Sequence, residues 1–229
     1  MSGPLAIVCD FDGTATVLDI GDEISRRFGG LEHFQLQKQM FARGELDTRG
    51  IIEGIYTHVL APEEEIREFA AREARLRPGF VELVQAARDR GAPFYLASGG
   101  LRQYIEAILE ANLPRALIEH IQIRANEGVF TPEGLRVRFP GDEASRLAGC
   151  AVCGSCKRVS IADARKAGAT YVLGLGDGFA DRCLVRFADR TFARKDSYLQ
   201  KYCDEHRLPY TPFTEMYEAA DVVRRHRNC

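Results

Sequence analysis

Two carboxylates separated by one residue, Asp10 and Asp12, directly follow a short apolar run near the N-terminus. That run, from Leu5 to Cys9, is typical of a buried parallel strand, and Gly13 lets the chain turn sharply after it. One carboxylate of such a pair can attack an electrophile while the other transfers a proton, and carboxylate oxygens also bind Mg²⁺ well. An acidic turn without a catalytic role is the alternative interpretation of this stretch taken alone.

Further polar groups follow predicted strands or begin a helix later in the chain. Ser98 and Gly99 can donate hydrogen bonds to a phosphate, and Lys157 can supply a positive charge. Asp177 and Asp181 can add carboxylates around a metal ion. Taken alone, each group also has a structural interpretation, as an ordinary turn or as a solvated side chain. Because strand ends of an open α/β sheet converge on one crevice, the groups together supply what phosphoryl transfer needs.

The elements that must position these groups alternate between strand and helix. This order predicts an α/β fold, a Rossmann-like parallel sheet with helices on both faces and a small helical cap domain inserted after the first strand. Residues 1–15 and 77–229 are predicted to form the core, and residues 16–76 the cap. Strands are predicted over 5–9, 93–97, 118–123, 171–175 and 190–193, with a hairpin over 128–139 and no periodicity over 140–156. Helices are predicted over 19–28, 31–41, 48–59, 62–76, 79–90, 101–111, 157–167, 180–185, 198–205 and 213–223.

The composition is that of an ordinary globular protein. The chain has 229 residues, of which 45% are hydrophobic and 28% charged, and its formal net charge is −2. No basic stretch indicates nucleic-acid binding, and no apolar run approaches the roughly 18 residues of a membrane span. The N-terminus lacks the cationic region of a signal peptide, so we expect a cytoplasmic protein.

The four groups of polar residues resemble the motifs of haloacid dehalogenase superfamily phosphatases. The first motif of that family, Asp-x-Asp-x-Thr, corresponds to residues 10–14, and the fourth, Gly-Asp-x-x-x-Asp, to residues 176–181. Ser98 stands at the second motif and Lys157 at the third. The resemblance covers nearly the whole chain, and an Asp two residues after the first Asp is the pattern of the phosphatases and mutases of the family.

The resemblance implies a role for each motif residue. Asp10 would be the nucleophile that forms an aspartyl-phosphate, and Asp12 would protonate the leaving oxygen and then activate water. Ser98, Gly99 and Lys157 would bind phosphate. Mg²⁺ would be held by Asp10, the backbone carbonyl of Asp12, and Asp177, with Asp181 in support.

The predicted cap resembles that of the phosphoserine phosphatase branch. Within that branch, residues 150–157, 192–194 and 208–213 are similar to the methionine-salvage phosphatases, and the cysteine-rich 150–157 also to the phosphoethanolamine/phosphocholine phosphatases. Phosphoserine phosphatase proper fits less well, because Gly13 replaces a usual Ser and Glu53 falls near the position of the cap arginine that pairs the substrate carboxylate. Arg49, one helical turn away, could replace that arginine.

Acidic residues are predicted to surround the mouth of the cap. An acidic mouth favours a substrate with a cationic or neutral organic group over one with a carboxylate. A solvated helix start is the equally weighted alternative for the same residues. The residues concerned are Asp19, Asp22, Glu23 and Glu53.

Three of the seven cysteines, Cys150, Cys153 and Cys156, lie at C-x₂-C-x₂-C spacing just before Lys157. Their thiolates could hold a second metal, Zn²⁺, but a closed zinc site needs four ligands. Asp142, His120 or a distant Cys could be the fourth. Reduced thiols that only pack a loop are the alternative, and the odd cysteine count excludes complete disulfide pairing within one chain.

The function expected from these residues is that of a Mg²⁺-dependent phosphatase of a small phosphorylated metabolite. A phosphomutase, phosphoserine phosphatase proper and a non-enzymatic phosphate-binding module are the alternatives. The sequence does not distinguish a monomer from a homodimer.

Overall fold

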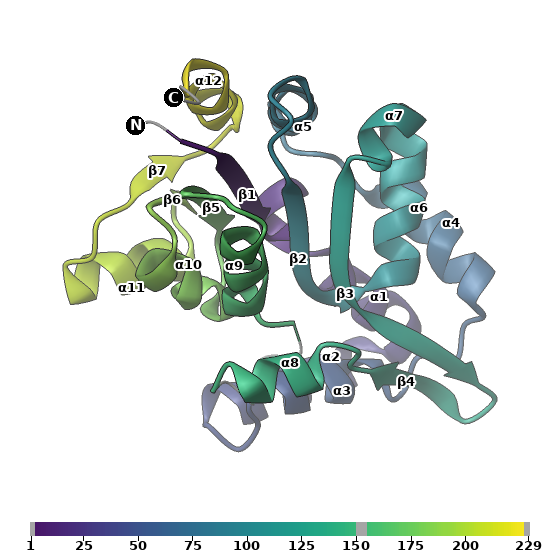
Figure 1. Cartoon of the computed structure of the whole chain (residues 1–229). Helices are drawn as coiled ribbons and strands as arrows, with labels where there is room; N and C mark the ends of the chain where they lie inside the picture. Colours follow the sequence, from purple (N-terminus) through teal and green to yellow (C-terminus); the bar gives the residue numbers. More distant parts are fainter. Residues whose placement is uncertain (1–2, 150–154, 227–229) are drawn as a thin grey trace.

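A seven-stranded sheet organises the part of the chain that the computed structural model describes, residues 3–149 and 155–226 (Figure 1). The strand order is β4-β3-β2-β1-β5-β6-β7, and every neighbouring pair is parallel except β3 and β4. The predicted α/β fold with helices on both faces and a helical region after the first strand is therefore confirmed. The strands are β1 (Leu5–Cys9), β2 (Phe94–Leu101), β3 (Ile121–Thr131), β4 (Gly134–Arg138), β5 (Tyr171–Gly176), β6 (Arg190–Arg194) and β7 (Thr211–Phe213).

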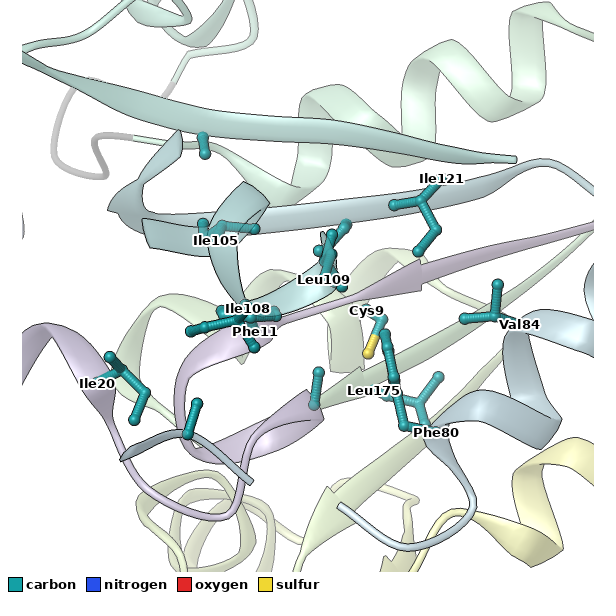
Figure 2. Close-up of a cluster of buried hydrophobic side chains, with 14 of the residues drawn as sticks. Cys9, Phe11, Ile20, Phe80, Val84, Ile105, Ile108, Leu109, Ile121 and Leu175 are labelled. Atoms are coloured by element: carbon teal, nitrogen blue, oxygen red, sulfur yellow. The ribbon is translucent and has the colours of Figure 1, made fainter. Parts of the chain in front are cut away.

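Alternate side chains of β1 enter two separate cores, because successive residues of a strand point to opposite faces of a sheet. Leu5, Ile7 and Cys9 join the larger core, which contains residues of α5 (Phe80–Asp89), α6 (Arg102–Asn112) and α12 (Tyr217–Arg225). Figure 2 shows Cys9 in this core, together with residues of α5 and α6. Ala6 and Val8 join the core under α9 (Lys157–Lys166) and α10 (Arg182–Phe187). A third, smaller cluster packs α11 (Tyr198–His206) near β6.

A helical insertion, α1 to α4, lies between β1 and β2. A π-type turn (Phe11–Ala15) leads from β1 into it, and Figure 1 shows α2 and α3 below the sheet. Asp19 and Asp47 cap α1 and α3 by accepting hydrogen bonds from backbone N–H groups of the first turn. The helices are α1 (Ile20–Ile24), which continues into a π-type turn (Ser25–Gly29), α2 (Leu31–Ala42), α3 (Thr48–Tyr56) and α4 (Glu63–Glu73).

Arg77 ties the start and the end of the helical insertion together. The side chain is 9% exposed, and its guanidinium donates four hydrogen bonds to backbone carbonyls. Three of these acceptors belong to the segment after β1: Thr14 at 2.6 Å, Gly13 at 2.7 Å and Thr16 at 3.0 Å. The fourth is Thr214 at 3.1 Å. This one side chain therefore fixes the path of the loop that follows Asp10 and Asp12.

The β3–β4 hairpin forms a further connection between the sheet and the insertion. The backbone N–H of Leu135 donates to the carbonyl of Val59 at 2.9 Å, and Gly134 lies so near Thr57 that a Cβ on this glycine would be 2.4 Å from the Thr57 carbonyl oxygen. Residues 128–139 were predicted as a hairpin, and the hairpin supports the helix α3 from outside the insertion.

Two predicted elements in the middle of the chain are wrong in their limits. The strand predicted over 118–123 begins only at Ile121, because Pro114 starts a helical turn, α7 (Arg115–Ile118). The strand predicted over 93–97 continues through residues 98–100 as part of β2, and its register with β3 shifts between Ala97 and Leu101. The strand therefore continues, but its irregularity turns the polar residues away from regular pairing.

Besides α7, two further short elements were not predicted. In the stretch without periodicity, Asp142 and Glu143 begin α8 (Asp142–Leu147), where acidic side chains favour a helix N-terminus. The helix predicted over 213–223 begins only at Tyr217 as α12, and the strand β7 lies just before it. α9 and α11 otherwise lie close to their predicted limits, and η3 (Phe179–Asp181) is a short 3₁₀ helix before α10. Among the described residues, no helix combines the length and the apolar character needed to cross a lipid bilayer.

Candidate active site

Three carboxylates from distant parts of the chain meet at the carboxyl ends of β1 and β5. Asp10 follows β1, and Asp177 and Asp181 follow β5. Each offers one oxygen, and these oxygens all lie within 4.8 Å of one another. Three carboxylate oxygens so close are a hard donor set that fits Mg²⁺. Asp10 and Asp181 are almost completely buried, so their mutual repulsion needs compensation by a cation.

Lys157 supplies one positive charge to this group. Its Nζ lies 2.7 Å from Asp10 Oδ1 and 3.1 Å from Asp181 Oδ1, and the side chain is 2% exposed. Burial alone would lower the pKa of Lys157, but the two carboxylates outweigh burial and raise this pKa above its usual value. Lys157 therefore stays charged. Burial and the charge of Asp181 raise the pKa of Asp10, and the Lys157 charge opposes that shift.

Asp177 is held in place from three sides. Thr14 Oγ1 donates to its Oδ1 at 2.7 Å, and Arg194 Nη2 lies 3.4 Å from its Oδ2. Gly13, at φ +74°, lies directly beside it, since a Cβ on this glycine would be 2.7 Å from Asp177 Oδ2. Only glycine fits this position without moving the carboxylate or straining the backbone.

Asp181 uses its second oxygen to organise the loop after β5. Its Oδ2 accepts hydrogen bonds from the backbone N–H groups of Asp177, at 2.9 Å, and Gly178, at 2.8 Å. The other oxygen faces Lys157 and the acids. Asp181 thus links the loop that carries Asp177 to the cation that contacts Asp10.

The carboxylate of Asp12 is separate from the three-acid group. Its Oδ1 accepts from the backbone N–H of Ile20 at 3.0 Å, and its Oδ2 accepts from the Tyr104 hydroxyl at 2.6 Å and from Ser98 Oγ at 3.3 Å. Burial raises the pKa of Asp12 to about 6, although these hydrogen bonds act in the opposite direction. The group can therefore gain and lose a proton near neutral pH, as acid–base catalysis requires.

A cavity of about 360 Å³ opens over these residues. Ser98, Gly99 and Gly100 form part of its wall beside Asp12 and Lys157. The insertion supplies the opposite wall, and much of this wall is apolar. Ile52 lies directly beside Gly99, since a Cβ on this glycine would be 3.1 Å from Ile52 Cδ1. The apolar side chains of the insertion that line the cavity are Phe41, Ile51, Ile52 and Ile55.

The four acids predicted at the cap mouth occupy different surroundings. Asp19 and Asp22 line the cavity, and Asp22 forms an ion pair with Lys38 at 2.9 Å. Glu23 pairs with Arg26 and is not among the lining residues. Glu53 pairs with Arg49 at 3.3 Å and lines another pocket, beside the β3–β4 hairpin. The negative charge at the mouth is therefore smaller than the sequence suggests.

The predicted cysteine cluster lies mostly outside the described residues, since only Cys156 of its three members is described. Cys156 is buried at the residue before α9 and thus directly precedes Lys157. Two candidates for a fourth zinc ligand have other partners: His120 Nε2 contacts the Ala92 carbonyl at 2.9 Å, and Asp142 pairs with Arg49. Over residues 3–149 and 155–226, the only cluster of potential metal ligands is formed by the three aspartates described above.

Sequence reasoning missed Arg77, Arg194, Tyr56 and Tyr104. The two tyrosines lie in helical apolar patterns and read as core residues, and Tyr104 contacts Asp12 across 92 residues of sequence. Arg77 lies in the loop between α4 and α5, and Arg194 is the last residue of β6. No local pattern distinguishes such residues, because their roles come from long-range contacts.

Comparison with known proteins agrees with this geometry. Residues 7–186 match the haloacid dehalogenase-like hydrolase family. Two curated relatives are the 2-hydroxy-3-keto-5-methylthiopentenyl-1-phosphate phosphatases of Geobacillus kaustophilus, 31% identical, and Geobacillus thermodenitrificans, 29% identical. Each alignment covers 98% of this chain and 98% of the relative.

The fold is also that of solved phosphatases. A structure of a phospho-aspartyl intermediate analogue of phosphoserine phosphatase superposes with a TM-score of 0.68 and 18% identity, over 96% of this chain and 99% of the other. The resemblance to this superfamily predicted from the motifs is confirmed. The chain belongs to the haloacid dehalogenase-like hydrolases and is a phosphatase of that family.

Proposed function

We propose that this phosphatase hydrolyses a small phosphorylated metabolite through an aspartyl-phosphate on Asp10. The observation that carries the proposal is the meeting of Asp10, Asp177 and Asp181 within 4.8 Å, with Lys157 against them, at the floor of the cavity. When bound by these acids, Mg²⁺ would neutralise phosphate oxygens so that an anionic nucleophile can approach phosphorus. The family and the donor set support Mg²⁺ as the cofactor.

The chain's own residues account for both steps of hydrolysis. An oxygen of Asp10 attacks phosphorus, the bond from phosphorus to the ester oxygen breaks, and Asp12 gives its proton to that oxygen. Asp12, now a carboxylate, takes a proton from water, which attacks phosphorus, releases inorganic phosphate and restores Asp10. Ser98, the backbone of Gly99, and Lys157 would hold the phosphoryl oxygens.

For the organic part of the substrate, we propose an uncharged and partly apolar group, as in 2-hydroxy-3-keto-5-methylthiopentenyl-1-phosphate. The insertion offers apolar side chains next to the phosphate motif, with Ile52 beside Gly99. Lys38 is the only cation that the described part of the insertion contributes to the cavity, and it already pairs with Asp22. A substrate carboxylate such as that of phosphoserine would therefore compete with Asp22 for this cation.

The test is a panel of phosphate esters assayed with Mg²⁺. The enol phosphate should exceed phosphoserine and phosphoethanolamine in kcat/KM by at least about tenfold, equal to about 1.4 kcal/mol of transition-state binding. Equal or better use of phosphoserine would refute the substrate proposal while leaving the chemistry intact.

The covalent step is tested separately with Asp10→Asn. This variant should keep its thermal stability, lose turnover and take up no radiolabel from a labelled substrate after acid quench. Turnover comparable to that of the unmodified enzyme would refute the nucleophile assignment. Transfer of the label to a second organic acceptor instead of water would indicate a phosphomutase.

A further inference from the structure

Two buried tyrosine hydroxyls lead from the helical insertion to Asp12. The Tyr104 hydroxyl donates to Asp12 Oδ2 at 2.6 Å, and the Tyr56 hydroxyl lies near that of Tyr104, since both oxygens lie within 3.2 Å of the position that a Cβ on Gly21 would take. Both side chains are 1% exposed. Tyr104 belongs to α6, in the core, whereas Tyr56 is the last residue of α3, in the insertion. The chain of hydroxyls therefore crosses from one part of the molecule to the other and ends on the proposed acid–base group.

The surrounding backbone leaves room for both hydroxyls. A Cβ on Gly100 would lie 1.8 Å from the Tyr104 hydroxyl oxygen and 2.7 Å from Asp12 Oδ2. A Cβ on Gly21 would lie 2.7 Å from the Tyr56 hydroxyl oxygen and 3.2 Å from that of Tyr104. Glycines from β2 and α1 thus allow these oxygens to approach the backbone closely, and any other residue would displace them.

Tyr104 and the backbone N–H of Ile20 hold opposite oxygens of the Asp12 carboxyl group, at 2.6 and 3.0 Å. Two donors on two oxygens fix the plane of a carboxyl group. The contact of Ser98 with Asp12, at 3.3 Å, is longer than either. The orientation of the acid–base group therefore depends on one residue of α1 and one of α6.

We propose that Tyr104 is a positioning residue that orients the carboxyl group of Asp12 toward the leaving oxygen. Tyr56 makes this orientation depend on the position of the insertion over the cavity. The inference rests on the proton-transfer role of Asp12 proposed above. If the insertion moves away from the sheet, Tyr56 leaves Tyr104, and the hydroxyl that holds Asp12 loses the neighbouring hydroxyl that packs beside it. Asp12 is then fully oriented only when α3 covers the cavity.

The leaving group gives a readout that a purely structural role would not change. In the first step the bond from Asp10 to phosphorus forms, the bond from phosphorus to the ester oxygen breaks, and the proton of Asp12 passes to that oxygen. An alkoxide is a poor leaving group and needs this proton, whereas para-nitrophenolate is stable without it. Misorientation of Asp12 should therefore slow an alkyl phosphate far more than para-nitrophenyl phosphate.

The experiment compares kcat/KM for an alkyl phosphate and for para-nitrophenyl phosphate in matched variants. Tyr104→Phe should lower the alkyl value by about 10-fold to 100-fold and the aryl value by less than about threefold, since general acid catalysis contributes about 100-fold or more. Tyr56→Phe should give the same contrast with a smaller loss. The double variant should resemble Tyr104→Phe, because Tyr56 acts only through Tyr104.

Two reference variants make the result decisive. Tyr202→Phe removes another buried hydroxyl, which accepts from Arg186 at 2.6 Å away from Asp12, and should produce no contrast. Asp12→Asn should show the largest contrast. If Asp12→Asn shows the contrast and Tyr104→Phe does not, or if Tyr104→Phe changes only KM, the positioning role is wrong. If Asp12→Asn shows none, the proton-transfer role itself fails, and this inference fails with it.

Discussion

Replacement of Arg77 by alanine tests how the loop after β1 is stabilised. The guanidinium holds the carbonyls of Gly13, Thr14 and Thr16 in buried contacts, and that of Thr214 in a partly buried one. Each buried carbonyl left without a donor costs about 1–3 kcal/mol. Water can enter the space that the side chain leaves and satisfy some of them, so we expect a total loss of about 3–5 kcal/mol in the free energy of unfolding.

A loss of this size is a large share of the stability of a typical domain and is easily measured. For a chain of this length each kcal/mol lowers Tm by about 2–4 °C, which predicts a decrease of about 6–20 °C in a thermal scan. Urea titration gives the free energy directly.

The neighbouring Arg75 is the matched control. It also donates to two backbone carbonyls, those of Arg72 and Ala74, but it is exposed, so Arg75→Ala should cost less than about 0.5 kcal/mol. Arg77→Lys retains the charge but lacks the several planar N–H donors of a guanidinium, so it should recover only part of the lost free energy of unfolding. A cost below about 1 kcal/mol for Arg77→Ala would show that these hydrogen bonds do not determine the loop, contrary to the reasoning here.

Three further predictions concern the site. Gly13→Ala and Gly44→Ala both place alanine at positive φ, and each should cost about 1–2 kcal/mol in the free energy of unfolding. Only Gly13→Ala should raise the Mg²⁺ concentration needed for half-maximal activity, because nothing surrounds Gly44 within 4 Å. Equal Mg²⁺ titrations of the two variants would contradict this. The kcat/KM for an alkyl phosphate should fall as pH rises through about 6, because burial raises the pKa of Asp12 to about 6 and Asp12 can donate a proton only below that pKa. A pH profile that stays flat there would count against Asp12 as the proton donor. Ile52→Lys should lower kcat/KM for a phosphate ester with an uncharged organic group by about tenfold. Glu53→Gln changes a residue that faces the other pocket and should leave kcat/KM within about twofold. Equal losses in the two variants would mean that the cavity wall is misidentified.

The parts of this site that follow buried strands could be predicted from the sequence. The apolar run before Asp10 and the one before Asp177 identify neighbouring parallel strands, and their ends necessarily meet at one edge. Local patterns also predicted most helices of the insertion. These signals depend only on residues close together in the chain.

Other features depend on contacts that no local pattern records. The direction of Glu53, away from the cavity, follows from the way α3 packs against the β3–β4 hairpin. The partnership of Tyr104 with Asp12 requires α6 to lie beside the loop after β1. α8 has only six residues, too few for a helical period to be recognised.

Besides its two linkers, the helical insertion contacts the rest of the molecule at several places, such as Arg67 with α6, and one of these places is the β3–β4 hairpin. The backbone bond from Leu135 to Val59 joins it to the β3–β4 hairpin, which is an extension of the sheet. A lid that is held only by two adjacent linkers can move freely. A lid that is also hydrogen-bonded to the hairpin must either break that hydrogen bond or move together with the hairpin. Any opening of the insertion to admit substrate would therefore have to break this hydrogen bond or bend β3 and β4, although the hairpin itself contributes no residue to the cavity beside Asp10.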